Sequence, residues 1–298
     1  MNARVLAAAL ALGALLAAPV RAQQDFSNVR IESEKVADGI YVLKGAGGNI
    51  GLSVGDDGAF MIDDQFAPLS EKILAAVKAI TAEPLRFVVN THWHGDHTGG
   101  NESMGKAGAL LVAHENVRRR MSAEQFNATF DRTTPPSPPG ALPVVTFTDA
   151  LTFHWNGQTI RVFHVDPAHT DGDSIIHFVE ADVLHMGDLF FNGSYPYIDV
   201  SSGGRIGGVV SAAERVLKAA GDRTRLIPGH GPVGTKADLE AYRDVVATVG
   251  DRVAALKAQG RSREEVVAAK PTAELDAKWG QGFMKPDVWV GLVYDSVE

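Results

Sequence analysis

The stretch THWHGDHTGGNE at residues 91–102 constrains the fold most, because it crowds polar side chains where the strand-like run LRFVVN stops. It holds three of the ten histidines of the chain and one aspartate within six positions, as His92, His94, Asp96 and His97. In an extended segment His92 and His94 point the same way, whereas Gly95 and the turn after it let Asp96 and His97 face a second point. The stretch therefore predicts two neighbouring groups of imidazole and carboxylate side chains.

Three later stretches have similar chemistry and lie within about four residues of the end of a strand-like run: PAHTDGDS around His169, HMGDLF around Asp188 and IPGHGP around His230. Loops at one edge of packed sheets bring side chains from distant sequence together, so we expect one site. Its nitrogen and oxygen donors suit zinc, although iron or manganese would accept the same set. Seven ligands are too many for one tetrahedral ion and fit two ions that share a carboxylate and a hydroxide.

The pattern of apolar residues predicts an α/β fold built from two similar halves. Residues 29–64 alternate short apolar runs with turns, and SEKILAAVKAI has the period of a helix. The second half repeats this order from a hairpin around Asn156-Gly157 onwards. We expect one domain over residues 23–260 and a tail, 261–298, that docks on it through four aromatic side chains, Trp279, Phe283, Trp289 and Tyr294. The Pro-rich residues 122–143 predict a mobile surface loop or lid.

Residues 1–22 have the features of a secretory signal peptide. Arg4 precedes an apolar run, and small residues lie before a cleavage site near Ala22. We therefore expect a periplasmic or secreted protein that has no membrane segment in its mature form. The formal net charge of −8 argues against nucleic acid or an anionic membrane as partner. The composition leaves the oligomeric state open, and the absence of cysteine restricts a metal site to nitrogen and oxygen ligands.

The motif HWHGDH at 92–97, followed by His169, Asp188 and His230, resembles that of the metallo-β-lactamase-fold hydrolases. The resemblance runs from about Val36 to Gly234 and implies an αββα sandwich of two similar halves with two zinc ions at one edge of the sheets. It implies that His92, His94 and His169 hold the first zinc and that Asp96, His97 and His230 hold the second. Asp188 would bridge the two ions or bind the second, and Asp96 would also orient the nucleophile.

The expected activity is opening of a cyclic amide or ester by a hydroxide that bridges the two metal ions. Export favours a β-lactamase-like activity, of class B type and thus linked to antibiotic resistance, with a small-molecule substrate. One departure weighs against this: in the best-known lactamase branch a cysteine occupies the position of Asp188, and a lysine stands where this chain has Phe191. Asp188 is more similar to the glyoxalase II and lactonase branches, so a lactonase or thioesterase remains an alternative. A non-catalytic periplasmic zinc-binding protein and an iron-dependent oxygenase of the same fold are two further alternatives.

Several residues near the motifs are candidates for contacts with the substrate. Trp93, Tyr195 and Gly204 lie next to the expected ligands, and Arg118 to Arg120 could replace the missing lysine. The motif G-x-S-x-G around Ser53 offers a nucleophile without a metal. It lies inside a strand that leads into a hairpin, however, so the strand–turn–helix context of such a nucleophile is absent.

Overall fold

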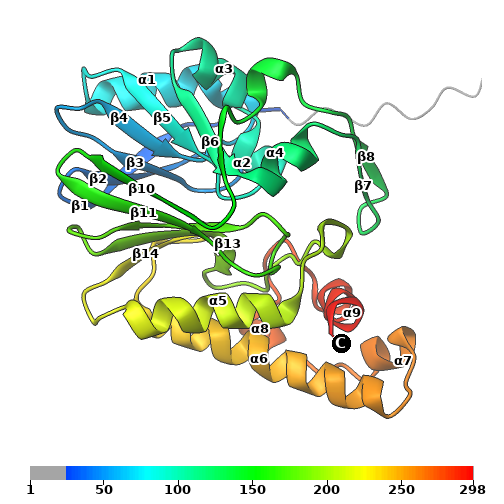
Figure 1. Cartoon of the computed structure of the whole chain (residues 1–298). Helices are drawn as coiled ribbons and strands as arrows, with labels where there is room; N and C mark the ends of the chain where they lie inside the picture. Colours follow the sequence, from blue (N-terminus) through cyan, green and yellow to red (C-terminus); the bar gives the residue numbers. More distant parts are fainter. Residues whose placement is uncertain (1–24, 298) are drawn as a thin grey trace, which may run out of the picture.

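The structure is a computed structural model that describes residues 25–297, shown in Figure 1. The predicted signal peptide at 1–22 and its cleavage site near Ala22 lie outside the described residues. Two sheets pack face to face in the middle, and helices cover the outer face of each. This arrangement confirms the αββα sandwich expected from the sequence.

Seven strands form the first sheet: β1 (Glu32–Ala37), β2 (Ile40–Lys44), β3 (Ile50–Ser53), β4 (Ala59–Ile62), β5 (Leu85–Val89), β6 (Leu110–His114) and β9 (Val145–Phe147). Strands β1, β2 and β3 each pair antiparallel with the next strand, and the pairs β4–β5, β5–β6 and β6–β9 are parallel. Strand β9 is not predictable from the sequence, because three residues at the edge of a sheet carry too short a pattern to recognise.

Five strands form the second sheet: β10 (Ala150–Trp155), β11 (Gln158–His164), β12 (Ser174–Phe178), β13 (Val183–Phe191) and β14 (Arg225–His230). The predicted hairpin joins β10 to β11 through Asn156 and Gly157, whose φ values of 54° and 70° suit a tight turn between twisted strands. Strand β13 continues beyond the strand-like run that the sequence places before Asp188. Asp188 therefore lies inside this strand and not in a loop after it, at a point where the pairing with β14 shifts register.

Each half contains the same type of connection, a helix that joins two parallel strands, and this accounts for their similar element order. Helix α1 (Ser70–Ile80) joins β4 to the parallel β5, and helix α5 (Ile206–Ala219) joins β13 to the parallel β14. Figure 1 shows α1 and α3 (Asn101–Lys106) outside the first sheet, and α5 and α6 (Lys236–Ala258) outside the second. Parallel strands of this kind place functional side chains at their carboxyl ends.

The apolar core follows these layers. Phe60 and Val89 of the first sheet meet Ile160 and Phe178 of the second, and all four side chains are fully buried. A second cluster fills the space between the first sheet and α1, and the largest packs the second sheet against α5, α6 and the C-terminal helices. The edge at which the strands end is thus held by packing on both sides of each sheet.

The C-terminal residues contain three helices: α7 (Arg263–Ala268), α8 (Asp276–Trp279) and α9 (Pro286–Ser296). Trp279 and Trp289 are buried in the largest cluster, and Tyr294 packs against it. The expectation for Phe283 is wrong, because its side chain is 71% exposed. It lies in the connection between α8 and α9, where an apolar residue is not turned towards the core by a helical period.

The Pro-rich segment is more ordered in its secondary structure than a plain loop. It follows helix α4 (Glu115–Met121) and contains the hairpin of β7 (Gln125–Asn127) and β8 (Arg132–Thr134) and the short helix η2 (Pro139–Ala141).

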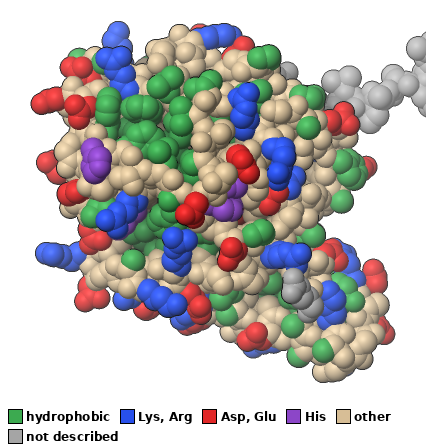
Figure 2. All heavy atoms as spheres, viewed as in Figure 1, with side chains coloured by type: hydrophobic (Ala, Val, Ile, Leu, Met, Phe, Trp, Pro, Cys, Tyr) green, Lys and Arg blue, Asp and Glu red, His purple; other side chains and the backbone are tan. Residues whose placement is uncertain are grey.

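Within residues 25–297 no helix has both the length and the apolar character needed to cross a membrane. On the face that Figure 2 shows, basic and acidic side chains are interspersed over the described residues, and no single basic patch covers it.

Candidate metal centre

The structure brings all seven predicted metal ligands to one edge of the sandwich, although they come from five elements. His92 and His94 lie in the loop after β5, Asp96 and His97 lie in the short helix α2 (Gly95–Thr98), and His169 lies between β11 and β12. Asp188 belongs to β13, and His230 is the last residue of β14. They form two groups, and within each group the possible ligand atoms lie within 4.8 Å of one another. The first group is His92, His94, His169 and Asp188, and the second is Asp96, His97 and His230.

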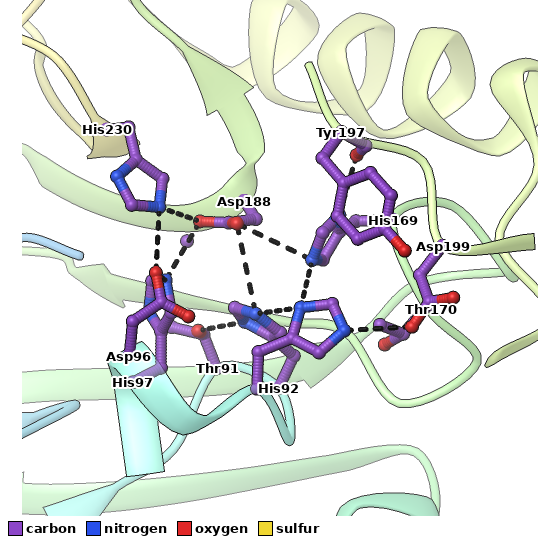
Figure 3. A network of polar contacts seen from close by, with 12 residues as sticks. Thr91, His92, Asp96, His97, His169, Thr170, Asp188, Tyr197, Asp199 and His230 are labelled. Carbon is purple, nitrogen blue, oxygen red and sulfur yellow. Dashed lines mark hydrogen bonds and ion pairs between the residues drawn. The ribbon is translucent and has the colours of Figure 1, made fainter. Parts of the chain in front are cut away.

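The first group has three imidazole nitrogens that lie close together, and Figure 3 shows two of these rings, His92 and His169, beside Asp188. Nδ1 of His94 lies 3.1 Å from Nε2 of His92 and 2.9 Å from Nε2 of His169. Oδ2 of Asp188 lies 3.5 Å from the same nitrogen of His169. These four atoms are the donors that this group can offer to one metal ion.

The second group lies on the other side of Asp188. Oδ1 of Asp188 is 3.1 Å from Nε2 of His97 and 3.4 Å from Nε2 of His230. Oδ2 of Asp96 is 3.4 Å from the same nitrogen of His230. The two carboxylate oxygens of Asp188 therefore face one group each, which is the arrangement that a bridging ligand needs.

The outer nitrogen of each buried histidine is bound to the protein. Nδ1 of His92 contacts Oγ1 of Thr91 at 2.9 Å, Nε2 of His94 contacts Asp199 at 2.9 Å, and Nδ1 of His169 contacts the carbonyl oxygen of Tyr197 at 2.7 Å. Nδ1 of His97 contacts Asp63 at 2.7 Å. An oxygen acceptor at the outer nitrogen fixes the orientation of the ring and directs its inner nitrogen towards the place where a metal ion would bind.

Asp63 and Asp199 contact two of the proposed ligands, and neither is among the residues that the sequence predicts for the site. Both side chains are fully buried. Asp63 directly follows the buried strand β4, which is a position where the sequence could have signalled a role. Asp199 has no such signal, because it lies in an irregular segment eleven residues after Asp188 and reaches His94 only through the fold.

Burial and opposite charges set the ionisation of the two groups. Burial opposes ionisation of Asp188, but His230 and His97 outweigh it and hold the pKa of this carboxyl well below its usual range. Burial lowers the pKa of His169 to about 4 and also holds that of His92 well below its ordinary value. In His230 the carboxylate of Asp188 outweighs burial and raises the pKa to about 9. Neutral His92 and His169 beside an ionised Asp188 have the protonation states that metal ligands need.

The chain approaches the centre closely at Gly229. A Cβ atom on this residue would lie 2.0 Å from Oδ1 of Asp188, so only glycine fits at this position of β14, beside the carboxylate.

The centre opens towards solvent on the side of the second group. The side chains of His230 and Asp96 are 31% and 28% exposed, whereas those of His97 and His169 are fully buried.

The donor set fits a pair of metal ions. Nε2 of His97 and Oδ1 of Asp188 are buried and lack a hydrogen-bond partner among the described residues, a costly arrangement that a metal ion between them would relieve. Imidazole nitrogens and carboxylate oxygens suit zinc, iron or manganese. The two groups are therefore consistent with a dinuclear metal centre whose metal remains to be identified.

The predicted substrate contacts lie in different surroundings. Trp93 is 8% exposed, donates from Nε1 to Ser202 and lines a cavity beside α2. Tyr195 is 1% exposed and stacks on Trp289 at 4.1 Å, so it belongs to the core and cannot contact a substrate. A Cβ on Gly204 would lie 2.4 Å from the carbonyl oxygen of His169, so this glycine supports the ligand loop from within. For both residues the expectation of a substrate contact is corrected.

Ser53 and the basic residues after β6 have structural partners. The hydroxyl of Ser53 is buried in β3 and accepts a hydrogen bond from Asn156 at 3.3 Å. Arg118 donates to the carbonyl oxygen of Pro143, and Arg120 forms a two-point ion pair with Asp171 at 2.7 and 2.8 Å. These arginines are thus engaged within the protein.

Comparison with known proteins places this geometry in a family. The family model described as "Metallo-beta-lactamase superfamily" matches residues 43–243. Over 253 residues the chain is 24% identical to an atrochrysone carboxyl ACP thioesterase of Aspergillus terreus. The aligned region covers 80% of this chain and 70% of that relative. It is also 28% identical over 169 residues to a hydroxyacylglutathione hydrolase of Polaromonas sp. This aligned region covers 55% of this chain and 55% of that relative, so the chain spans about half of the relative's length.

The fold is also similar to that of solved structures. A metallo-beta-lactamase from Pontibacter korlensis aligns with a TM-score of 0.61 at 20% sequence identity, over 73% of this chain and 99% of that one. At this identity the likeness concerns the fold.

Proposed function

Because the chain belongs to the metallo-beta-lactamase superfamily, we propose that it is a hydrolase that uses a dinuclear metal centre to cleave an acyl bond in a small molecule. The observation that carries the proposal is the position of Asp188, whose two oxygens face one group of histidines each. A bound metal pair would supply hydroxide at neutral pH and a Lewis acid for the substrate carbonyl. No serine or cysteine nucleophile is then required.

The residues of the chain supply position and charge for this chemistry. His92, His94 and His169 present their inner nitrogens from rings that are fixed on the outer side. Asp96 lies at the open side with Oδ2 turned to His230, where its carboxylate can accept a hydrogen bond and so orient a nucleophile. Fixed groups of this kind lower the barrier because they need no reorganisation during the reaction.

We further propose that esters, lactones or thioesters are better substrates than β-lactams. The ring of Phe191 stacks on His230 at 5.1 Å and 25°, so an apolar face lies where the best-known lactamase branch has a lysine. Of the expected substitutes, Arg118 is bound to Pro143 and Arg120 to Asp171, and the more exposed Arg119 lies 3.6 Å from the same Asp171. The names of the two curated relatives, a thioesterase and a hydroxyacylglutathione hydrolase, support the same direction. This shifts the substrate away from the β-lactamase-like activity that the sequence favours.

The partner and the location of the protein also remain proposals. The interspersed charges on the face in Figure 2 and the net charge of −8 support a small-molecule substrate over nucleic acid. The leader-like residues 1–22 support export to the periplasm or beyond. In that location a substrate would be met outside the cytoplasm.

A panel of substrates tests the proposed activity. We would compare kcat/KM of the zinc-loaded protein for an aryl ester, an acyl-homoserine lactone, an acyl thioester, a penicillin, a cephalosporin and a carbapenem. The proposal predicts that one of the first three exceeds every β-lactam by at least about tenfold, which corresponds to about 1.4 kcal/mol of transition-state binding. A β-lactam as the best substrate would restore the lactamase assignment, and no turnover in the panel would favour a zinc-binding protein without catalysis.

A further inference from the structure

A cavity of about 240 Å³ lies beside the metal centre and has no role in the function described so far. Its inner wall comes from the metal-binding motif, through Trp93, Gly95 and Thr98, and its outer wall from the Pro-rich segment, through residues such as Gln125 and Thr134. The segment that the sequence marks as a surface loop therefore encloses a space next to the centre. Without this segment the motif would lie open on that side.

The cavity reaches the backbone between two proposed ligands. Gly95 separates His94 of the first group from Asp96 of the second, and it lines the cavity. A Cβ atom built on Gly95 meets no atom within 4 Å, in contrast to the Cβ on Gly229. The space therefore begins at the residue that joins the two groups.

The charged residues of the cavity wall are paired. The guanidinium of Arg120 is held by Asp171 at 2.7 and 2.8 Å and by Oε1 of Gln125 at 3.1 Å. Glu102 on the opposite wall forms an ion pair with Lys106 at 3.0 Å. Both charged side chains thus already have a partner of opposite charge within the protein. The remaining wall has four polar side chains, Thr98, Gln125, Thr134 and Ser137, and a larger number of apolar ones: Ala67, Trp93, Met121, Ala123, Pro135, Pro138 and Ala141.

We propose that this cavity binds the non-reacting part of the substrate and selects an uncharged, mainly apolar group. The inference rests on the proposed hydrolase function and names the substrate class of the same site. A cavity of about 150 Å³ is enough for a benzene molecule, so 240 Å³ accommodates an aromatic ring with a short linker or an acyl chain of similar size. Phenylacetyl and hexanoyl esters are thus preferred over acetyl esters.

The expected preference follows from burial of apolar surface. Each buried methylene contributes about a fourfold gain in binding, and energy from a remote group of the substrate improves kcat/KM when that group is held in the transition state. The kcat/KM of the phenylacetyl ester should therefore exceed that of the acetyl ester by at least about tenfold.

Two variants narrow the cavity without touching the metal ligands. Ala67 and Ala123 both line it and are exposed on opposite rims, so Ala67→Phe and Ala123→Phe place a ring over the space. Ala128→Phe is the matched control, because Ala128 is exposed on the same segment but does not line the cavity. Each cavity variant should lower kcat/KM for the phenylacetyl ester at least about tenfold and change the acetyl ester by less than about twofold. The control should change neither.

A binding measurement separates this inference from the proposed function. Met121 lines the cavity, so in protein labelled at the methionine methyl groups its resonance should shift on addition of phenylacetamide. The shift should disappear in Ala123→Phe and remain in Ala128→Phe. Normal hydrolysis of acetyl esters, without a phenylacetyl preference or a Met121 shift, would overturn only the cavity assignment. If no ester, lactone or thioester were hydrolysed by the zinc-loaded protein, the proposed function itself would fail and the substrate role of the cavity with it.

Discussion

Each buried histidine of the centre uses one ring nitrogen for the protein and presents the other to the neighbouring group. Thr91, Asp199 and Asp63 contact the outer nitrogens of His92, His94 and His97. The positions of the inner nitrogens are therefore determined before any metal ion binds, and the cost of ordering the ligands is met during folding. The two groups differ in access, since the second is the more exposed.

Replacement of Asp188 tests the bridging assignment. Because its oxygens face both groups, Asp188→Ala should release the metal of the second group and leave most of the metal bound to three histidines. The fall in kcat/KM should exceed the roughly 10- to 100-fold losses typical when only an outer partner of a ligand is removed. Elemental analysis and kinetics would measure both effects, with Asp166→Ala as the control, since Asp166 is exposed in the loop that precedes His169. Two tightly bound metal ions in Asp188→Ala would contradict the assignment.

A milder substitution tests the role of Asp199. In Asp199→Asn the contact to Nε2 of His94 keeps its shape but loses the charge of the acceptor. We expect the affinity for the first metal ion to fall about 10- to 100-fold, because the imidazole becomes a weaker donor. Titration of the protein with zinc against a competing chelator measures this affinity. An unchanged Kd would show that Asp199 serves only the fold around Ser202, with which it also forms a hydrogen bond.

At the scale of elements, the C-terminal helices stabilise the half of the molecule that carries Asp188 and His230. Trp289 of α9 is fully buried and stacks on Tyr195 at 4.1 Å and 9°. Its large side chain packs in the same cluster as α5 and α6. The helices after residue 260 are thus part of the core that supports the second sheet.

Trp289→Ala measures this contribution. Loss of a fully buried tryptophan should lower the free energy of unfolding by about 3–5 kcal/mol, through lost burial and an unfilled cavity. The neighbouring Val288 is 43% exposed, so Val288→Ala should change stability by no more than about 0.5 kcal/mol. Urea denaturation of both variants compares them. Equal midpoints for Trp289→Ala and the unsubstituted chain would show that α9 does not support the core.

The elements show what the sequence could and could not predict. The apolar run of β5 and the helical period of α1 were predictable because each gives a clear local pattern, and the four polar stretches were visible because each follows or interrupts a strand-like run. Phe283 was not predictable, because an apolar residue in a connection follows no period. Tyr195 and Gly204 lie close in sequence to Asp188, but the chain turns there and directs them into the core. The cavity depends on contacts between α2 and the Pro-rich segment, which local patterns do not encode.

At the scale of the whole molecule, the metal centre joins the two halves. His92, His94, Asp96 and His97 belong to the first half, and the three remaining proposed ligands belong to the second. A metal ion bound at either group therefore links residues that separate when the protein unfolds. Binding to the folded chain alone stabilises it by mass action.

Zinc should for this reason raise the stability of the fold. At a free concentration about 1,000 times Kd, one site adds about 4 kcal/mol to the free energy of unfolding. Urea denaturation with zinc and with chelator would give the difference, and His169→Ala should reduce it because the first group then loses a donor. The same midpoint in zinc and in chelator would mean that the groups do not bind metal in the folded state.

Removal and return of the metal tests the dinuclear hydrolase most directly. Protein freed of metal by a chelator, and shown to be so by elemental analysis, should hydrolyse its best acyl substrate at the background rate. Activity should return as zinc is added and should level off at about two ions per chain, one for each group of ligands. Full hydrolysis by the metal-free protein would contradict a metal-dependent mechanism and would direct attention to a side-chain nucleophile.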